Sequence, residues 1–134
     1  MAVECASDGT FAVSVSVAGH QLTVDEPESL GGTNTGPSPF ALLMASVGAC
    51  TAITVADAAR ERGLTVDGVR VRVKLKQNKI SSSAGDPELL IQEIRRSIEI
   101  DGDLSPEDRD WLYSRGAACP VSRSVAAGIA VPVT

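Results

Sequence analysis

One stretch of the chain, PFALLMASVGACTAITVADAA, consists almost entirely of small and apolar residues. Ser38 and Pro39 suit the cap and the first position of a helix, and Gly63 suits the left-handed residue that follows a helix end. We therefore predict a helix from Pro39 to Arg62, roughly 36 Å long at about 1.5 Å per residue. Because apolar residues occupy nearly every side of its first turns, this helix should be buried all round.

The residues before this helix alternate between apolar and polar side chains, which is typical of half-buried strands. The alternation predicts strands over residues 11–17 and 22–24, joined by a turn at residues 18–20, and a weaker strand over residues 2–5. Residues 26–39 are rich in Pro, Gly, Ser and Thr, so we expect a loop there. A loop of this length in a compact domain is usually functional or folded over a partner.

The residues after the helix predict a hairpin. Residues 69–76 alternate between aliphatic and basic side chains, and isoleucines mark a return strand over residues 94–100. We expect a β-bulge at residues 95–97. The basic face is best explained as a solvated surface paired with Glu93 and Glu99, not as a polyanion site.

A second helix should begin at Ser105, where a capping residue is followed by proline and two acids. Its predicted apolar stripe contains Trp111, Leu112, Ala118 and Cys119, and Pro120 interrupts it. Residues 125–133 suggest a final strand. This order of elements predicts an α+β fold with largely antiparallel pairing, in a single domain over residues 1–134.

The composition excludes several classes of function. A net charge of −5 and an aromatic content of 3% argue against a nucleic-acid surface. Three cysteines cannot form a framework of paired disulfides, and acids near the start argue against an export signal. The long apolar stretch is interrupted by polar residues, so we do not expect it to span a membrane. These features predict a cytoplasmic protein, where cysteine pairs are more often catalytic or metal-binding than structural.

No metal or cofactor site is predicted. The chain has one histidine, His20, and no Cys-x-x-Cys spacing of the kind that binds zinc. His20 is best explained as a residue of a hairpin turn, and Cys5, close to the start of the chain, as incidental. The cysteines that remain of interest are Cys50 and Cys119.

A reactive cysteine must be a thiolate, and a free thiol has a pKa of about 8.5. Cys50 lies mid-helix, and no cation shares its helical face, which carries Leu43, Ser46, Val47, Thr54 and Asp57. Cys119 precedes Pro120, which can open a short helix with Cys119 as its N-cap, and Arg123 lies about a turn further on. Local chemistry thus favours Cys119 as the more acidic thiol, although both cysteines are also compatible with simple packing.

Two motifs, GGTNTGPSPFALLMASVGACTAITV and GDLSPEDRDWLYSRGAACPVSRSV, resemble the OsmC/Ohr family of thiol peroxidases, and its OsmC-like subgroup in particular. The resemblance implies an intertwined homodimer in which antiparallel sheets wrap around long central helices. It implies that Cys50 attacks a hydroperoxide and becomes a sulfenic acid, which Cys119 resolves as a disulfide. It also implies that a dithiol, typically of the dihydrolipoamide type, reduces this disulfide.

The chain departs from the family pattern in the groups that activate the thiolate. The resemblance implies an arginine in the N-terminal strands and an acid early in the helix, but no arginine precedes Arg60, and Phe40 and Ala41 occupy the acid positions. Arg123 is the best replacement cation, with Glu28 or Asp57 as possible acids. The alternatives are therefore a binding module for a small apolar or thiol ligand, and a redox sensor or structural relic whose cysteines only pack.

Overall fold

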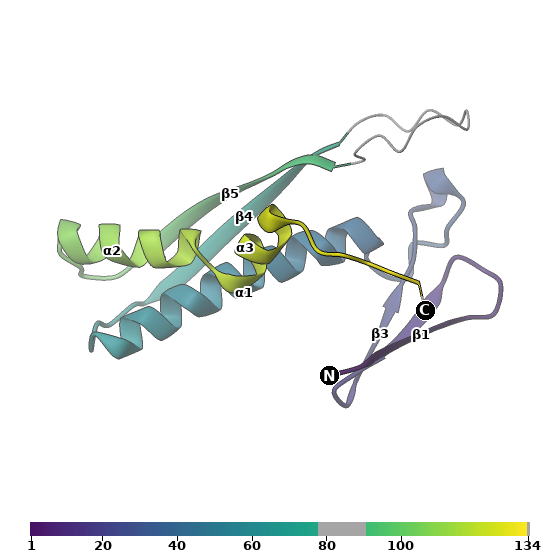
Figure 1. Cartoon of the computed structure of the whole chain (residues 1–134), viewed down its shortest axis with the longest axis horizontal. Helices are drawn as coiled ribbons and strands as arrows, with labels where there is room; N and C mark the ends of the chain where they lie inside the picture. The colour runs from purple at the N-terminus through teal and green to yellow at the C-terminus, as the bar shows by residue number, and fades with distance from the viewer. Residues whose placement is uncertain (78–90, 134) are drawn as a thin grey trace. The chain divides into compact units, whose positions relative to one another are not determined.

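The computed structural model describes residues 1–77 and 91–133. The chain forms two compact units, residues 1–43 and 44–134, and each is described by itself. Figure 1 follows the elements from β1 to α3 along the chain. All strand pairs among the described residues are antiparallel, so the predicted α+β class with a long helix is confirmed.

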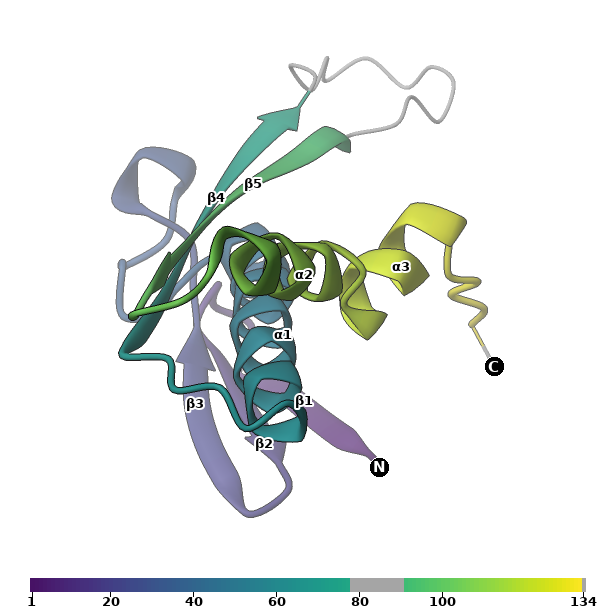
Figure 2. The same cartoon turned by 90° about the vertical axis from the view of Figure 1, so that its left-hand side faces the viewer.

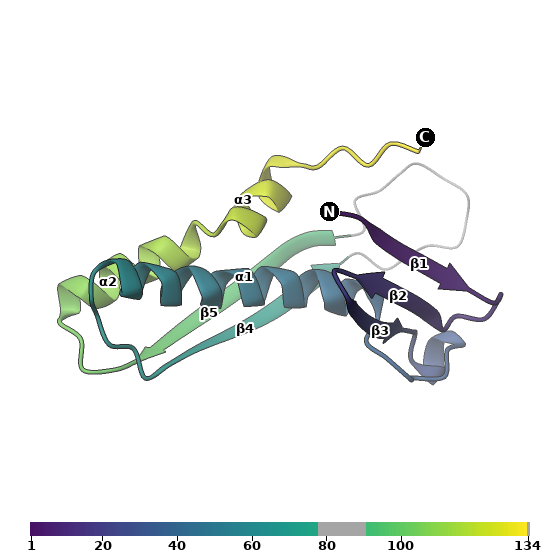
Figure 3. The ribbon, with the colours of Figure 1, turned by 90° about the horizontal axis from the view of Figure 1, so that it is seen from below.

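The first unit contains a three-stranded sheet in the order β1–β2–β3, with β2 in the middle (Figure 3). The strands are β1 (Val3–Ser7), β2 (Val13–Val17) and β3 (His20–Val24). Ala18 and Gly19 both adopt positive φ in the two-residue connection between β2 and β3, as a tight hairpin turn requires. Val15 and Val24 are the buried apolar side chains of this sheet.

The loop after β3 is organised by one carboxylate. Asp25 is only 1% exposed and accepts hydrogen bonds from the amides of Glu26, Thr33 and Thr35 and from both threonine hydroxyls. The Thr33 hydroxyl, the Thr35 amide and the other bonds outweigh burial and hold the pKa of Asp25 far below its usual value. The predicted loop is thus confirmed, apart from a short 3₁₀ helix, η1 (Glu28–Leu30).

The long helix α1 (Pro39–Glu61) ends within one residue of the prediction. The Ser38 hydroxyl accepts a hydrogen bond from the Ala41 amide at 3.3 Å, and Gly63 has a φ of 67°. Both predicted boundary residues are therefore confirmed in their roles. Among the described residues α1 is the one helix long and apolar enough to cross a membrane, which by itself is weak evidence for a membrane span.

The second unit is built on the hairpin of β4 (Gly68–Gln77) and β5 (Ile91–Asp101), followed by α2 (Pro106–Ala117) and α3 (Pro120–Ala127). Figures 1 and 2 show α1 and α2 on the same face of this hairpin. The core between them consists of Val55, Ala58, Ala59, Ile100 and Leu112. A Cβ at Gly116 would lie 2.6 Å from Val55 Cγ2, so only glycine lets α2 approach α1 this closely.

Three predictions about the fold are wrong. Residues 129–133 form no strand, and Val125 lies in α3, since Pro120 opens a helix that continues past it. The β4–β5 register is regular across residues 95–97, and its shift lies at Lys76 and Gln77. The apolar stripe of α2 ends before Cys119, because the helix stops at Ala117.

The prediction that α1 is buried all round is also wrong for the single chain. Its buried residues lie on one side, facing the hairpin and α2: Val47, Gly48, Thr51, Val55, Ala58 and Ala59. Ile53, on another side, is 68% exposed. The predicted tip at residues 81–87 lies outside the described residues. The single-domain organisation stays a prediction.

Replacing Asp25 with asparagine should destabilise the protein, because an amide cannot replace the carboxylate as acceptor for every donor in the loop. The lowered pKa means that the carboxylate stabilises the fold fully above its ordinary pKa of 3.8, and that this contribution is lost as the pH falls below that value. The urea midpoint of Asp25→Asn should therefore lie well below that of the wild type at neutral pH, and the gap should narrow in acid. Asp8→Asn, at an exposed turn, is the control; a gap independent of pH would contradict this account.

Candidate active site

The second unit brings Cys50 and Cys119 together, although they are far apart in sequence. Cys50 lies in α1 and is half-buried, whereas Cys119 lies between α2 and α3 and is fully buried. The Cys50 side chain is among the groups whose interaction lowers the pKa of Cys119, so the two thiols are neighbours in the folded unit. Both cysteines are present as free thiols.

The chain places Cys119 by breaking a helix with proline. Cys119 has an extended backbone, with φ −60° and ψ 146°, and is the N-cap of α3, as predicted. Its Sγ lies 3.1 Å from the Ser122 hydroxyl in the first turn of α3 and 3.3 Å from the Thr51 hydroxyl on α1. The thiol is thus surrounded by hydrogen-bonding groups from two helices, although no water reaches it.

Arg96 on β5 supplies the positive charge of this site. Its Nη1 lies 2.7 Å from the Thr51 hydroxyl and 3.6 Å from Cys119 Sγ. Its guanidinium also donates to the carbonyls of Gly116 and Ala117 at the end of α2, and the Gly116 carbonyl also accepts the Cys119 amide. These bonds fix the guanidinium beside the sulfur.

In the structure the neighbouring hydroxyls donate to backbone carbonyls, whereas Arg96 is a donor in every state. Thr51 donates its single hydroxyl hydrogen to the Val47 carbonyl at 2.8 Å, and Ser122 donates to the Cys119 carbonyl at 2.9 Å. To stabilise a thiolate, each would have to turn away from its carbonyl. A guanidinium is always a donor and always charged, so Arg96 needs no such change.

The balance of these effects makes Cys119 an acidic thiol. Burial raises its pKa, but hydrogen bonds from the Ser122 hydroxyl and amide, the Thr51 hydroxyl and the Cys50 thiol outweigh burial and lower the pKa to about 7. At neutral pH a large fraction of Cys119 is therefore thiolate. The sequence-based argument for an acidic Cys119 anticipated the contribution of the helix amide, but not those of the Ser122 and Thr51 hydroxyls.

The other residues singled out from the sequence lie elsewhere. Arg123 is exposed and lines a separate hollow of about 680 Å³ that also includes Asp57, Arg60 and Arg115. Within the described residues its side chain makes no hydrogen bond or ion pair, so its role as an activating cation stays a prediction. Glu28 belongs to η1 in the first unit.

Arg96 could have been found from the sequence. Residues Ile94, Ile98 and Ile100 alternate along β5, and Arg96 falls on the same face, opposite Val73 in the register. A lone cation in line with apolar side chains must have a buried partner to offset its desolvation. We predicted a bulge at this point, which concealed the regular alternation.

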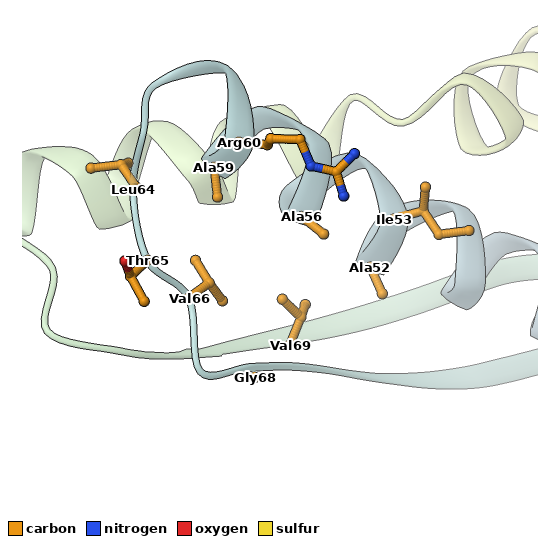
Figure 4. Close-up of a pocket in the computed structure, with 10 residues that line it drawn as sticks. All are labelled: Ala52, Ile53, Ala56, Ala59, Arg60, Leu64, Thr65, Val66, Gly68 and Val69. Carbon is orange, nitrogen blue, oxygen red and sulfur yellow. The ribbon is translucent and has the colours of Figure 1, made fainter.

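Two further hollows adjoin the helices of this unit. One, of about 310 Å³, borders Arg96 and Ser122 and is otherwise lined mainly by aliphatic residues: Val47, Ile94, Val125 and Ala126. The other, of about 640 Å³, runs between α1 and the start of β4, where Ala52, Ala56 and Val69 face one another (Figure 4). Nowhere in residues 1–77 and 91–133 do three metal-ligating side chains converge.

The family model of OsmC-like proteins matches residues 32–134, which include both cysteines and Arg96. The chain belongs to the OsmC-like family. No protein of curated function matches the chain closely enough to count as a relative.

Solved structures share the OsmC-like fold at low sequence identity. An OsmC-like protein of Mycoplasma pneumoniae is 19% identical, with a TM-score of 0.77 over 93% of this chain and 86% of the other. An organic hydroperoxide resistance protein of Elizabethkingia anophelis, with bound thiocyanate, is 18% identical, with a TM-score of 0.65 over 90% and 84%. An organic hydroperoxide resistance protein OsmC of Legionella pneumophila is 16% identical, with a TM-score of 0.58 over 91% and 85%.

The acidity of Cys119 can be measured in a Cys5→Ser, Cys50→Ser protein, in which the serine at position 50 keeps a hydrogen-bond donor. Thiolate absorbance in the ultraviolet should rise with a midpoint near pH 7. In urea the midpoint should return to about 8.5, that of an ordinary thiol. Because the folded state favours the thiolate, the free energy of unfolding should increase as the pH rises from about 7 towards 9. A folded-state midpoint equal to that in urea would contradict the assignment.

Proposed function

We propose that this OsmC-like protein is a thiol peroxidase that reduces organic hydroperoxides through Cys50 and Cys119. The observation that carries the proposal is a fully buried thiol, Cys119, beside a fixed guanidinium and with a second thiol, Cys50, as its neighbour. Buried cysteines that only pack need no cation. A thiolate held at neutral pH is the form in which cysteine attacks peroxides and disulfides.

Cys50 is the better candidate to meet the hydroperoxide, because it is half-buried and Cys119 is inaccessible. The neighbouring Cys119 thiolate accepts the Cys50 hydrogen bond and can take its proton. The Cys50 thiolate then attacks the distal peroxide oxygen. A sulfur–oxygen bond forms, the oxygen–oxygen bond breaks, and the alkoxide leaves and is protonated to an alcohol.

The second step joins the two sulfurs. Cys119, again a thiolate, attacks the sulfur of the Cys50 sulfenic acid, and hydroxide leaves and is protonated to water. The net change converts a hydroperoxide and two thiols into an alcohol, water and one disulfide. A dithiol reductant must then restore the thiols.

A preference for organic substrates is supported by the hollow near this site. It borders Arg96 and Ser122, which contact Cys119, and apart from these two residues and Glu93 its lining is aliphatic, as a binding site for an alkyl chain would be. The structural similarity to hydroperoxide resistance proteins points in the same direction.

We further propose that the working protein is a homodimer. The outward side of α1 carries Ile53, 68% exposed, beside the apolar groove of Figure 4. Exposed apolar surface of this extent along a long helix is usually covered by a partner. A second copy of α1 is the occupant that the family resemblance implies.

Adding about one equivalent of cumene hydroperoxide to the reduced protein should remove two thiols within the mixing time and form a Cys50–Cys119 disulfide, seen by mass spectrometry after digestion. Cys119→Ser should lose only one thiol and be trapped as a sulfenic acid by dimedone. Cys50→Ser should consume no hydroperoxide, and Cys5→Ser should behave as the wild type. Survival of both thiols would refute the peroxidase, and an intact ligand retained in native mass spectra would then favour a binding module.

Ile53→Glu should weaken self-association, because it places a charge in the centre of the proposed interface. Sedimentation equilibrium should give a mass of two chains for the wild type and of one chain for the variant at micromolar concentration. Tyr113→Glu, which changes an exposed aromatic residue on α2, is the control and should remain dimeric. A wild type that sediments as one chain would contradict the proposal.

A further inference from the structure

Arg96, Thr51 and Ser122 converge on one sulfur of the pair, that of Cys119. All three contact Cys119 Sγ, at distances of 3.6, 3.3 and 3.1 Å. The Cys50 thiol is a further neighbour of Cys119. In the described part of the chain, Arg96 is the one charged side chain that contacts Cys119. The two sulfurs of a disulfide formed here would therefore differ in environment.

The two sulfurs also differ in how easily solvent and reductants can reach them. Cys119 has no solvent exposure, while Cys50 is half-buried. A thiol arriving from solvent must approach along the axis of the sulfur–sulfur bond and reach the sulfur that it attacks. Only Cys50 offers such an approach.

We propose that Arg96 gives the disulfide a fixed polarity, so that the reductant always attacks Cys50 and Cys119 always departs as a thiolate beside the guanidinium. The inference deepens the proposed function and rests on its redox pair. Arg96 acts as a positioning residue that stabilises the leaving sulfur.

The chemistry balances with a dithiol as the electron donor. A reductant thiolate attacks Cys50 Sγ, a bond forms between these two sulfurs, and the Cys50–Cys119 bond breaks with its electron pair on Cys119. The second thiolate of the reductant then attacks its own mixed-disulfide sulfur and releases Cys50, which takes up a proton. The dithiol leaves as a disulfide, and both cysteines are reduced.

A fixed direction of attack also explains why the buried cysteine, Cys119, is the one with the lowered pKa. Thiol–disulfide exchange is faster when the leaving thiol has a lower pKa, and the lowered pKa of Cys119 makes it the better leaving group. A monothiol would form a mixed disulfide on Cys50 that Cys119 can attack to restore the original disulfide, so a second thiol molecule must arrive to complete the reduction. The structure thus favours dithiol over monothiol reductants.

The test uses disulfide formed with diamide in a Cys5→Ser protein, so hydroperoxide chemistry is not involved. Reduction by dithiothreitol should slow by roughly threefold to tenfold in Arg96→Gln, because the departing sulfur becomes less acidic. Arg96→Lys should recover part of the rate, and Thr51→Val should slow it without changing the charge. Arg95→Gln, a neighbour on the solvent-facing side of β5, is the matched control and should reduce at the wild-type rate.

Two further measurements distinguish a fixed direction of attack on the disulfide from a general effect of the substitutions on protein stability. Reacting the oxidised protein with a limiting monothiol and digesting it under acid should locate the mixed disulfide on Cys50 alone. In the Cys5→Ser, Cys50→Ser background, the thiolate midpoint of Cys119 should rise in Arg96→Gln and in Thr51→Val, with circular dichroism showing that each variant is folded. Adducts on Cys119, a wild-type reduction rate in folded Arg96→Gln, or no disulfide after diamide would each overturn the proposal, whatever the peroxidase activity.

Discussion

The second unit depends on one charge placed on an apolar face. Arg96 occupies a position of β5 that period-two alternation reserves for a core side chain, in register with Val73. The desolvation of its guanidinium is offset by the carbonyls at the end of α2 and by Thr51. The same arginine therefore ties β5 to both helices and faces the buried sulfur.

Close approach of the helices makes this arrangement possible. Gly116 lets α2 lie against Val55, and Gly48 lets α1 lie close to Val73, where a Cβ would be 3.1 Å from its Cγ2. Larger residues at Gly48 and Gly116 would push the helices apart and move the Thr51 hydroxyl away from its contacts with Arg96 and Cys119. The small residues that make α1 slim thus serve the site as well as the packing.

The sequence predicted the elements well where local rules decide. Ser38, Gly63 and Ser105 mark helix boundaries through bonds that each residue makes within a few positions, and all three have the expected roles. Pro120 gave two conflicting predictions, a short helix capped by Cys119 and a strand through Val125, and the helix is correct because proline at its first position favours it. Local rules were insufficient where the decisive contact lies between elements.

The candidate site illustrates the same limit. Both cysteines were identified from their motifs, but the cation was sought along the sequence near Cys119 and found in Arg123, whereas the contact comes from a strand more than twenty residues earlier. The local argument for an acidic Cys119 relied on helix amides, and the Ser122 amide does contribute, but less than the Ser122 and Thr51 hydroxyls. The two properties that a reactive cysteine needs are thus found on different residues. Cys119 has the lowered pKa, and Cys50 is the one that solvent can reach. In the proposed peroxidase the two cysteines would therefore have different tasks: the accessible thiol meets the substrate, and the buried thiolate can accept its proton, which would speed the first step without being required for it.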